Sequence, residues 1–283
     1  MLDKTSKIDT GKLDFDPDML REKYRQERDK RIRQDGLEQY IEVEGKYDHF
    51  SVDPHVEPGF TREPLTDDVE VVLVGGGFGG LLSAARLQEN GLDSKNIRII
   101  EKAGDVGGTW YWNRYPGVAC DIESYIYLPL LEELGYMPKE KYSHGAEILE
   151  HAKNIARHYN LYDNACFQTD VTEILWDETS SRWIIYTNRN DQIRAKFIVM
   201  SNGYLQKPKL PGIPGLDLYK GHVFHTSRWD YDYTGGNAGG NLEKLKNKRV
   251  GIIGTGATAI QTIPHLGKWA AQLYVFQRTP SSI

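Results

Sequence analysis

The chain has 283 residues, of which 39% are hydrophobic and 27% are charged, and its formal net charge is −5. This composition is typical of a globular protein, and the acidic balance argues against nucleic-acid partners and anionic membrane surfaces, because both need a basic face. No apolar run is long enough to span a membrane, and the N-terminus lacks the apolar segment of a secretory signal. The chain has 2 cysteines, too few for a disulfide framework, so we expect a cytoplasmic protein.

Residues 1–66 differ in character from the rest of the chain. Asp16 and Pro17 are typical of a helix start, and DMLREKYRQERDKRIRQ alternates charges with few apolar positions. This pattern predicts a solvated helix that lies on a larger body, with a partner-binding arm as the alternative. Residues 43–66 contain Pro54, Pro58, Gly59 and Pro64, which predicts an extended segment that wraps or links. We therefore treat 1–66 as an N-terminal extension.

Residues 67–205 form the next segment, and it begins with an apolar run that enters a glycine turn. VEVVLVGGGFGG is followed by the helical pattern LLSAARLQENG and the short apolar strand NIRIIEK, which predicts one strand, turn, helix and strand unit. Residues 146–160 have the spacing of an amphipathic helix. Three strand-like stretches follow, TEILWDE, RWIIYTNR and IRAKFIVMSNG, and they predict an antiparallel meander whose last strand returns to the main sheet.

The glycine turn has the spacing Gly75-x-Gly77-x-x-Gly80. The first glycine permits the tight turn, the second lets backbone amides approach a pyrophosphate, and the third lets helix and strand pack closely. Glu101 lies 21 residues after Gly80, at the end of the next strand, where a carboxylate accepts hydrogen bonds from a ribose diol. The alternative is a plain glycine turn, but the strand, the helix and the acidic residue together favour a dinucleotide site.

Residues 206–248 form a connection that is rich in proline and glycine, and residues 249–283 begin a second strand, glycine turn, helix and strand unit. The residue after its second strand is basic: Arg278, 19 residues past Ala259. A basic side chain there suits a 2′-phosphate, so we expect NADP, with surface ion pairing of Arg278 as the alternative. The expected NADP contacts are Gly254, Thr255, Gly256, Ala257, Thr258, Ala259, Arg278 and Thr279.

Two different dinucleotide sites in one chain predict a flavin, FAD, that is reduced by NADPH. The predicted fold class is therefore α/β, with two Rossmann-like dinucleotide-binding units. The first unit is an FAD domain that carries an antiparallel β-meander, and the second is the truncated start of an NADP domain, because a doubly wound domain needs several more strands.

Two stretches between the glycine turns resemble the flavin-dependent Baeyer–Villiger monooxygenases. GGTWYWNRYPGVACD, residues 107–121, is similar to their motif GGxWxxxx[FY]PGxxxD. YKGHVFHTSRWD, residues 219–230, is similar to their fingerprint FxGxxxHxxxW[PD], with Tyr219 in place of the usual Phe. The fingerprint positions that match are Gly221, His225, Trp229 and Asp230. The resemblance covers roughly residues 66–283.

This resemblance implies an enzyme that uses FAD, NADPH and dioxygen to insert one oxygen atom next to a ketone carbonyl, giving an ester or lactone. The N-terminal extension resembles that of members that act on bulky or polycyclic ketones. The family's catalytic arginine lies in a later part of its NADP domain, which this chain does not reach. We therefore expect the chain to be either an N-terminal fragment or a truncated gene product, and in both cases we expect that it cannot run the full reaction.

The resemblance also implies roles for individual residues. Asp121 is the catalytic candidate, near the isoalloxazine ring and the nicotinamide ribose, and it is also a candidate cap for a helix predicted from SYIYLPLLEELG. Trp110 and Tyr115 are expected to give the flavin a rigid wall. The fingerprint residues would couple the position of the NADP domain to turnover, and the alternative is that His225 and Trp229 are a packed pair on a short helix. The implied FAD contacts are Thr109, Trp110, Asp121, Tyr127 and, through its backbone, Val171.

Two other functions stay open from the sequence. The first is an N-hydroxylating or sulfide-oxidising flavin monooxygenase, which shares the two glycine turns but not the two motifs. The second is a non-catalytic nucleotide-binding fragment that uses its N-terminal helix as an interaction arm. A flavin disulfide reductase is excluded, because Cys120 has no second cysteine near the flavin loop. We expect no metal site, and the sequence does not indicate an oligomeric state.

Overall fold

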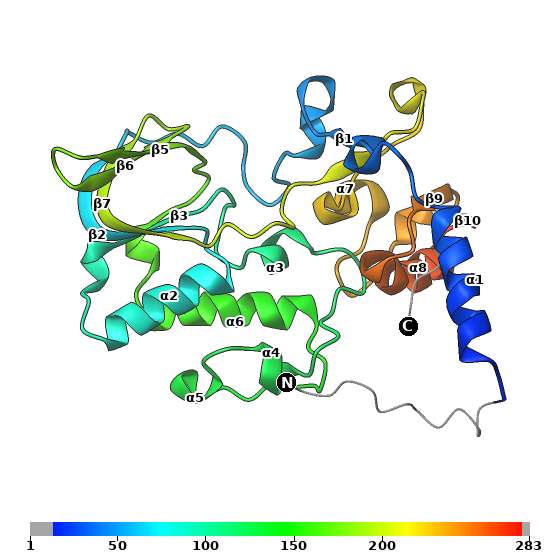
Figure 1. The fold of residues 1–283 in the computed structure, drawn as a ribbon, viewed down its shortest axis with the longest axis horizontal. Coiled ribbons are helices and arrows are strands. Elements are labelled where there is room, and N and C mark those ends of the chain that lie inside the picture. The colour runs from blue at the N-terminus through cyan, green and yellow to red at the C-terminus, as the bar shows by residue number, and fades with distance from the viewer. Residues whose placement is uncertain (1–13, 279–283) are drawn as a thin grey trace.

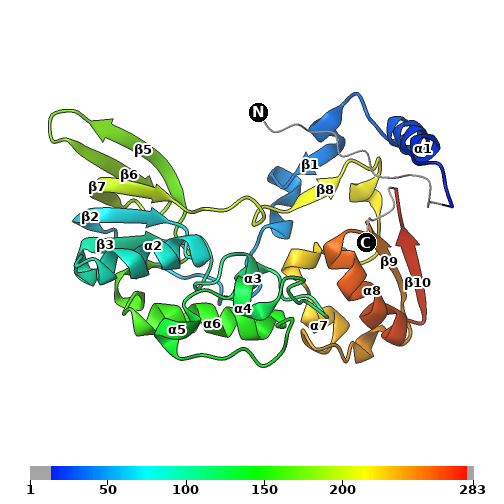
Figure 2. The ribbon, with the colours of Figure 1, turned by 60° about the horizontal axis from the view of Figure 1, so that its bottom comes forward.

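The computed structural model describes residues 14–278 and contains two α/β units that lie side by side (Figures 1 and 2). A six-stranded sheet forms the core of the first unit, and a two-stranded parallel sheet belongs to the second. Thr279, an expected NADP contact, lies outside the described residues. The α/β class with two strand, turn, helix and strand units is confirmed, and the boundaries of the four segments stay a prediction.

The large sheet has the strand order β4-β3-β2-β7-β6-β5. Strand β2 lies between β3 and β7 and is parallel to both, and β5, β6 and β7 form the expected antiparallel meander. The last strand of that meander returns to the main sheet, as predicted. The strands are β2 (Thr66–Val74), β3 (Ile97–Ile100), β4 (Ala165–Cys166), β5 (Val171–Asp177), β6 (Arg182–Thr187) and β7 (Gln192–Met200).

Helices α2 (Phe78–Glu89) and α6 (Gly145–His158) cover one face of this sheet (Figure 1). Helix α6 is amphipathic as expected: Ile148, Ala152 and Ile155 follow the i, i+4, i+7 spacing and are fully buried. Ala152 and Ile155 pack with Leu73 of β2 in one apolar cluster, and Ile148 packs with Trp110 in a second one. This packing fixes the glycine turn at the β2–α2 junction above the carboxyl ends of the parallel strands, where nucleotides bind in such folds.

The single helix predicted from SYIYLPLLEELG is wrong. The structure has two helices of four residues there, α4 (Ser124–Tyr127) and α5 (Leu131–Leu134). Leu128 is extended because the residue before a proline avoids the helical region, and Leu130 has a left-handed φ of +58°. Asp121 is not a helix cap, since the cap position of α4 is occupied by Glu123.

The N-terminal extension begins with helix α1 (Pro17–Asp29), which buries no side chain and is capped by the carboxylate of Asp16, as predicted. Residues 43–66 are not extended throughout. They contain a 3₁₀ helix (Gly45–Phe50), and Val43 and Phe50 form a small buried cluster with Leu210. Strand β1 (Tyr40–Glu42) pairs antiparallel with β8 (Lys209–Pro211), which ties the extension to the connection between the units.

The second unit consists of β9 (Arg249–Ile253), α8 (Ala257–Trp269) and β10 (Gln272–Phe276). Two more α-helices have four residues each: α3 (Thr109–Trp112) lies in the motif at residues 107–121, and α7 (Tyr231–Thr234) lies in the connection. The other 3₁₀ helices are Gly36–Gln39, Ser94–Asn96, Tyr162–Asn164, Leu216–Leu218, Thr226–Arg228 and Glu243–Leu245. Within residues 14–278 no helix is long and apolar enough to cross a membrane. The cytoplasmic location stays a prediction.

Candidate functional site

The first glycine turn is closed by contacts that only glycine permits. Gly75 has a φ of +113°, and a Cβ there would lie 2.4 Å from the carbonyl oxygen of Ser201, at the end of β7. A Cβ on Gly80 would lie 2.0 Å from the carbonyl oxygen of Gly75. The tight turn and the close approach of helix and strand therefore both depend on glycine at these positions.

Glu101 lies beside this turn, with only 7% of its surface exposed. Its Oε2 accepts a hydrogen bond of 2.6 Å from the backbone N–H of Gly76, and its Oε1 accepts one of 2.8 Å from that of Ala103. Burial raises the pKa of the Glu101 carboxyl, although these backbone donors oppose the shift. The backbone N–H of Thr169 donates to the carbonyl of Glu101 at 3.0 Å, which brings the start of β5 and Val171 to the same end of the sheet.

The flavin loop, residues 107–121, approaches the glycine turn through a second glycine. A Cβ on Gly108 would lie 2.9 Å from the Cα of Gly77, so the two backbones face each other without an intervening side chain. This arrangement is a backbone-lined cradle that a side chain would fill. It keeps side chains away from the N-terminus of helix α2, where phosphate groups bind in such folds.

Three aromatic rings meet where the cradle opens. The indole N–H of Trp110 donates to the hydroxyl of Tyr127 at 2.9 Å, and their ring centroids are 5.7 Å apart in an edge-on arrangement. Phe78, the first residue of α2, lies edge-on to Tyr127 at 6.1 Å. The expected FAD contacts Trp110 and Tyr127 are therefore brought together with the glycine turn, and Thr109 lies next to them on α3.

Tyr111 and Trp112 are packing residues and are almost fully buried. The hydroxyl of Tyr111 donates to the carboxylate of Asp53 in the N-terminal extension at 2.7 Å. The guanidinium of Arg228 lies 3.8 Å from the ring centre of Trp112, and burial lowers the pKa of Arg228 to about 10. The flavin loop thus contacts the N-terminal extension through Tyr111 and the fingerprint segment through Trp112.

Tyr115 faces the second unit. The expectation that its ring forms part of the wall beside the flavin is therefore wrong. Its hydroxyl donates to the side-chain oxygen of Gln261 on α8 at 2.9 Å, and the amide N–H of Gln261 donates to the carbonyl of Ala119 at 2.9 Å. The N–H of Gly117 donates to the carbonyl of Ala238 at 2.8 Å. Residues 115–119 therefore form a joint between the two glycine-turn units.

Asp121 ends this loop and is exposed. Among residues 14–278 its carboxylate accepts no hydrogen bond, so it is available to an incoming group. The adjacent Cys120 is buried, and its sulfur accepts a weak hydrogen bond from the N–H of Ile122 at 3.4 Å. Burial raises the pKa of the Cys120 thiol, which therefore stays protonated near neutral pH.

The second glycine turn joins β9 to α8 and is open. Gly254 has a φ of +101°, Gly256 is the N-cap of α8, and a Cβ on either would meet no described atom within 4 Å. The first turn of α8 contains Ala257, Thr258 and Ala259, and its N–H groups point toward this space. Arg278 follows β10 and is exposed, and its Nη1 donates to the side-chain oxygen of Gln39. No described carboxylate pairs with Arg278, so a surface ion pair does not explain it.

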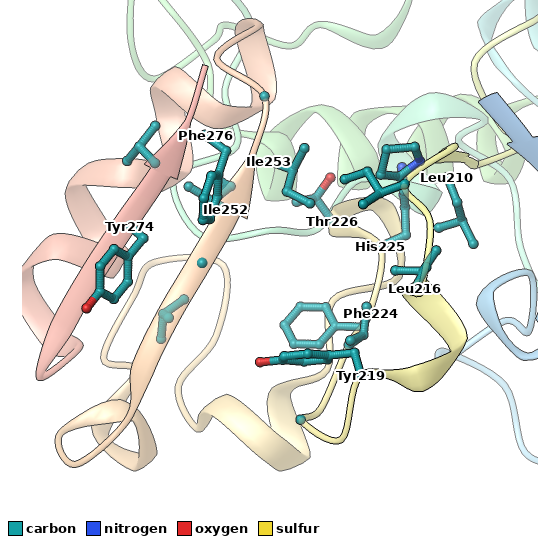
Figure 3. A pocket seen from close by; sticks show the side chains of 18 of the residues that line it. Leu210, Leu216, Tyr219, Phe224, His225, Thr226, Ile252, Ile253, Tyr274 and Phe276 are labelled. Atoms are coloured by element: carbon teal, nitrogen blue, oxygen red, sulfur yellow. The ribbon is translucent and has the colours of Figure 1, made fainter. Parts of the chain in front are cut away.

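A cavity of about 1650 Å³ lies between the β9–β10 sheet and the connection (Figure 3). Leu216, Tyr219 and Phe224 project into it from the connection, opposite Ile252 and Phe276 of the sheet. It is larger than a typical small-molecule pocket of roughly 300–1,000 Å³. The charged residues among its described lining are all basic: Arg33, Lys209, Lys248, Arg249 and Arg278. In a chain of net charge −5, this cavity is suited to an anionic ligand.

The fingerprint segment borders the same cavity. His225 caps the 3₁₀ helix Thr226–Arg228 and contacts the hydroxyl of Ser227 at 2.7 Å. Burial, helped by the charge of Arg228, lowers the pKa of His225 to about 4, so the imidazole is neutral at pH 7. The rings against Trp229 are Phe224 and Tyr231, so the proposed packed pair of His225 and Trp229 is wrong.

The other fingerprint positions shape the chain around this helix. The carboxylate of Asp230 accepts from the N–H of Tyr233 at 2.8 Å and contacts the imidazole of His222 at 2.7 Å. A Cβ on Gly221 would lie about 2.5 Å from the ring of Tyr219, so this glycine makes room for the aromatic residue that replaces Phe.

Residues 72–282 match the family model described as pyridine nucleotide-disulphide oxidoreductase. The chain belongs to this family. It is 58% identical over 268 residues to the neopentalenolactone D synthase of Streptomyces avermitilis, covering 95% of this chain and 45% of that protein. It is 52% identical over 264 residues to a Baeyer–Villiger monooxygenase of Streptomyces coelicolor, covering 93% and 43%. The polycyclic ketone monooxygenase of Thermothelomyces thermophila superposes with a TM-score of 0.88 at 44% identity, covering 93% and 45%.

The similarity to Baeyer–Villiger monooxygenases that the two motifs predicted is thus confirmed over nearly the whole chain. The chain spans less than half the length of these relatives. The family's name includes a disulfide, but Cys120 and Cys166 of this member are both free and buried. In the described part of the chain, no group of three or more His, Cys, Asp or Glu residues could hold a metal ion.

Sequence reasoning missed the residues of this family member that join its parts. Gln261 connects the flavin loop to α8, Asp53 connects the extension to Tyr111, and Gln39 contacts Arg278. Only Gln261 has a local signal, because it is the one amide side chain in the first half of α8 (ATAIQTIP).

Proposed function

We propose that this chain is the cofactor-binding part of a Baeyer–Villiger monooxygenase that uses FAD, NADPH and dioxygen. The observation that carries the proposal is the joint between the units, where Tyr115 of the flavin-loop motif contacts Gln261 beside the second glycine turn. This contact holds two dinucleotide sites next to each other, as electron transfer from a nicotinamide to a flavin requires. The reaction class, its substrates and the cofactor identities belong to this proposal.

The residues at the first turn fit FAD. The cradle between Gly77 and Gly108 is free of side chains, and the N-terminus of α2 faces it. Glu101 lies where a ribose would bind, and Trp110 and Tyr127 offer aromatic surface beside the cradle. Bound FAD would supply the chemistry, by accepting a hydride from NADPH and activating dioxygen. The protein would bind the cofactor, orient it and exclude water.

The residues at the second turn fit NADPH rather than NADH. The open backbone at Gly254 and Gly256 would receive the pyrophosphate. The charge of Arg278, which no carboxylate of residues 14–278 neutralises, would attract the 2′-phosphate. Neutral His225 and buried Trp229 border the same cavity from the connection. Because the fingerprint segment and the second unit line the same cavity, a shift of the second unit would also change the position of the fingerprint segment.

Asp121 is proposed as the catalytic residue of this part of the chain. Its carboxylate is exposed at the end of the flavin loop and has no partner among residues 14–278, so it can accept a hydrogen bond from a bound cofactor. Trp110 precedes Asp121 in the chain and Tyr127 follows it. The hydrogen bond between these two side chains would hold the loop in place. Its role is to orient groups around the flavin rather than to transfer oxygen.

Bulky ketones are the proposed substrates, with an ester or lactone as the product. Two relatives support this class by name, a neopentalenolactone D synthase and a polycyclic ketone monooxygenase. An N- or S-oxidising flavin monooxygenase is the second candidate for the protein's function, but neither relative nor the motif at residues 107–121 favours it.

The test is calorimetric titration of the purified protein with FAD and then with NADP⁺. The proposal predicts one FAD and one NADP⁺ per chain, each bound at its own site, and a loss of FAD binding alone in Gly108→Val. Binding of neither cofactor would support the non-catalytic fragment instead. Lactone formation from a polycyclic ketone by the full-length parent of this chain, rather than oxidation of an amine or sulfide, then separates the monooxygenase classes.

A further inference from the structure

One wall of the cavity beside the second glycine turn comes from the N-terminal extension. Arg33, Gln39 and Tyr40 line it together with Arg278, although more than two hundred residues separate the two segments in sequence. In both overall views α1 and the chain that follows it lie on the side of the molecule that carries β9 and β10 (Figures 1 and 2). The extension is therefore part of the second nucleotide site's surroundings.

Gln39 is held so that its side-chain oxygen faces Arg278. Its backbone carbonyl accepts from the N–H of Gly212 at 2.9 Å, and a Cβ on Gly212 would lie 2.5 Å from that oxygen. Its amide N–H donates to the carbonyl of Gly36 at 2.5 Å, and its amide oxygen accepts from Nη1 of Arg278. The backbone carbonyl, the side-chain nitrogen and the side-chain oxygen of Gln39 thus each have a partner. The pairing of β1 with β8 begins at the next residue, Tyr40.

The partner of Arg278 is an amide and not a carboxylate. A carboxylate would neutralise the guanidinium, whereas an amide oxygen orients it and leaves its charge available to an anion. Arg33 lies in the same turn, because the N–H of Gly36 donates to its carbonyl at 3.3 Å. Its guanidinium pairs with Asp35, so Arg33 adds a second cation with a partly compensated charge.

We propose that residues 33–40 of the N-terminal extension complete the pocket for the 2′-phosphate of NADP. Gln39 is the positioning residue that orients Arg278, and Arg33 contributes a second cation at the rim. The inference rests on the proposed function, in which the second turn holds NADP. It adds that selectivity for NADP over NAD depends on a segment outside both glycine-turn units.

The test compares Gln39→Ala and Gln39→Glu with the same changes at Gln26. Gln26 lies on α1, and among residues 14–278 its side chain bonds only to Glu22. It does not line the cavity, so it is a matched control. The dissociation constants for NADP⁺ and NAD⁺ are measured by calorimetry. Gln39→Ala should weaken NADP⁺ about fivefold and leave NAD⁺ unchanged, since one hydrogen bond is lost. Gln39→Glu should weaken NADP⁺ about tenfold or more, because a carboxylate competes with the phosphate.

A second pair of variants examines the rim. Arg33→Ala should weaken NADP⁺ only about twofold, as expected for one exposed cation whose charge Asp35 partly compensates, while Arg25→Ala on α1 should have no effect. Neither change should alter the affinity for NAD⁺.

Three results would overturn the inference. If the unmutated protein binds no NADP⁺, the proposed function fails and the inference fails with it. If NADP⁺ binds and Arg278→Ala weakens it, but both Gln39 variants match the unmutated protein, the proposed function stands and only the inference is lost. If the Gln39 variants weaken NADP⁺ and NAD⁺ equally, Gln39 is structural and has no part in recognising the 2′-phosphate.

Discussion

The hydroxyl of Tyr115 donates a 2.9 Å hydrogen bond to the side-chain oxygen of Gln261, across the boundary between the two units. The Gln261 amide donates to the carbonyl of Ala119, so the loop and helix α8 are joined in both directions. The aromatic loop at residues 107–121 therefore has two faces. Trp110 faces the first glycine turn with Tyr127, and Tyr115 faces the second unit.

Gln261→Leu tests this joint. The change keeps the size of the side chain but leaves the Tyr115 hydroxyl and the Ala119 carbonyl without their partner, so the free energy of unfolding should fall by about 1–3 kcal/mol. Chemical denaturation measures the loss, and Gln272→Leu on exposed β10 is the control. Equal stability of the two variants would mean that the joint contributes nothing to holding the units together.

Gly117→Ala probes the same joint through the backbone. Gly117 has a φ of +85°, and a Cβ there would lie 2.5 Å from the backbone carbonyl oxygen of Gln261. Gly91 has a similar φ of +94° with nothing within 4 Å of a Cβ, so Gly91→Ala reports the conformational strain alone. We expect Gly117→Ala to be the more destabilising by about 2 kcal/mol, since the clash adds to the strain. If both variants lose the same free energy of unfolding, helix α8 is not packed tightly against this loop at Gly117.

Asp191 makes the stability of the first unit depend on acidity. Burial opposes its charge, but hydrogen bonds from Arg62, Thr187 and the N–H of Leu65 outweigh burial and lower the pKa of Asp191 to about 2. Because the folded pKa lies below the unfolded value, the ionised group stabilises the fold above about pH 4, and this contribution is lost as pH falls toward 2. It is worth about 2 kcal/mol at neutral pH.

The measurement is the unfolding free energy of the unmutated protein and of Asp191→Asn at a series of pH values. The difference between them should be largest above about pH 4 and should shrink toward pH 2. Glu178→Gln is the control, because Glu178 is exposed in the turn that follows β5 in the same meander. A difference between the unmutated protein and Asp191→Asn that does not change with pH would exclude the Arg62 pair as its source.

The sequence predicted the parts of the fold that depend on local pattern. The strand, turn and helix around Gly75 and the meander after Asp170 follow from apolar runs, glycines and polar turns that lie close together in the chain. Pro129 carried a local signal as well, and the expected helix around it failed because the residue before a proline avoids the helical region.

The contacts that position the candidate site were not predictable in the same way. Tyr115 and Gln261 are 146 residues apart, and Gln39 and Arg278 are 239 apart. Such pairs depend on how segments that are distant in sequence pack together, and no local sequence period indicates this packing. The motif at residues 107–121 indicated a functional loop, but it did not indicate which of its aromatic residues faced which unit.

Reduction of a bound flavin by NADPH tests the central claim most directly. The protein is loaded with FAD, separated from free cofactor and mixed with NADPH or NADH without oxygen, and its visible absorbance is followed. The account predicts a yellow protein that NADPH bleaches faster than NADH does, with Arg278→Ala removing the preference. A protein that stays colourless after loading, or a bound flavin that NADPH leaves oxidised, would contradict it.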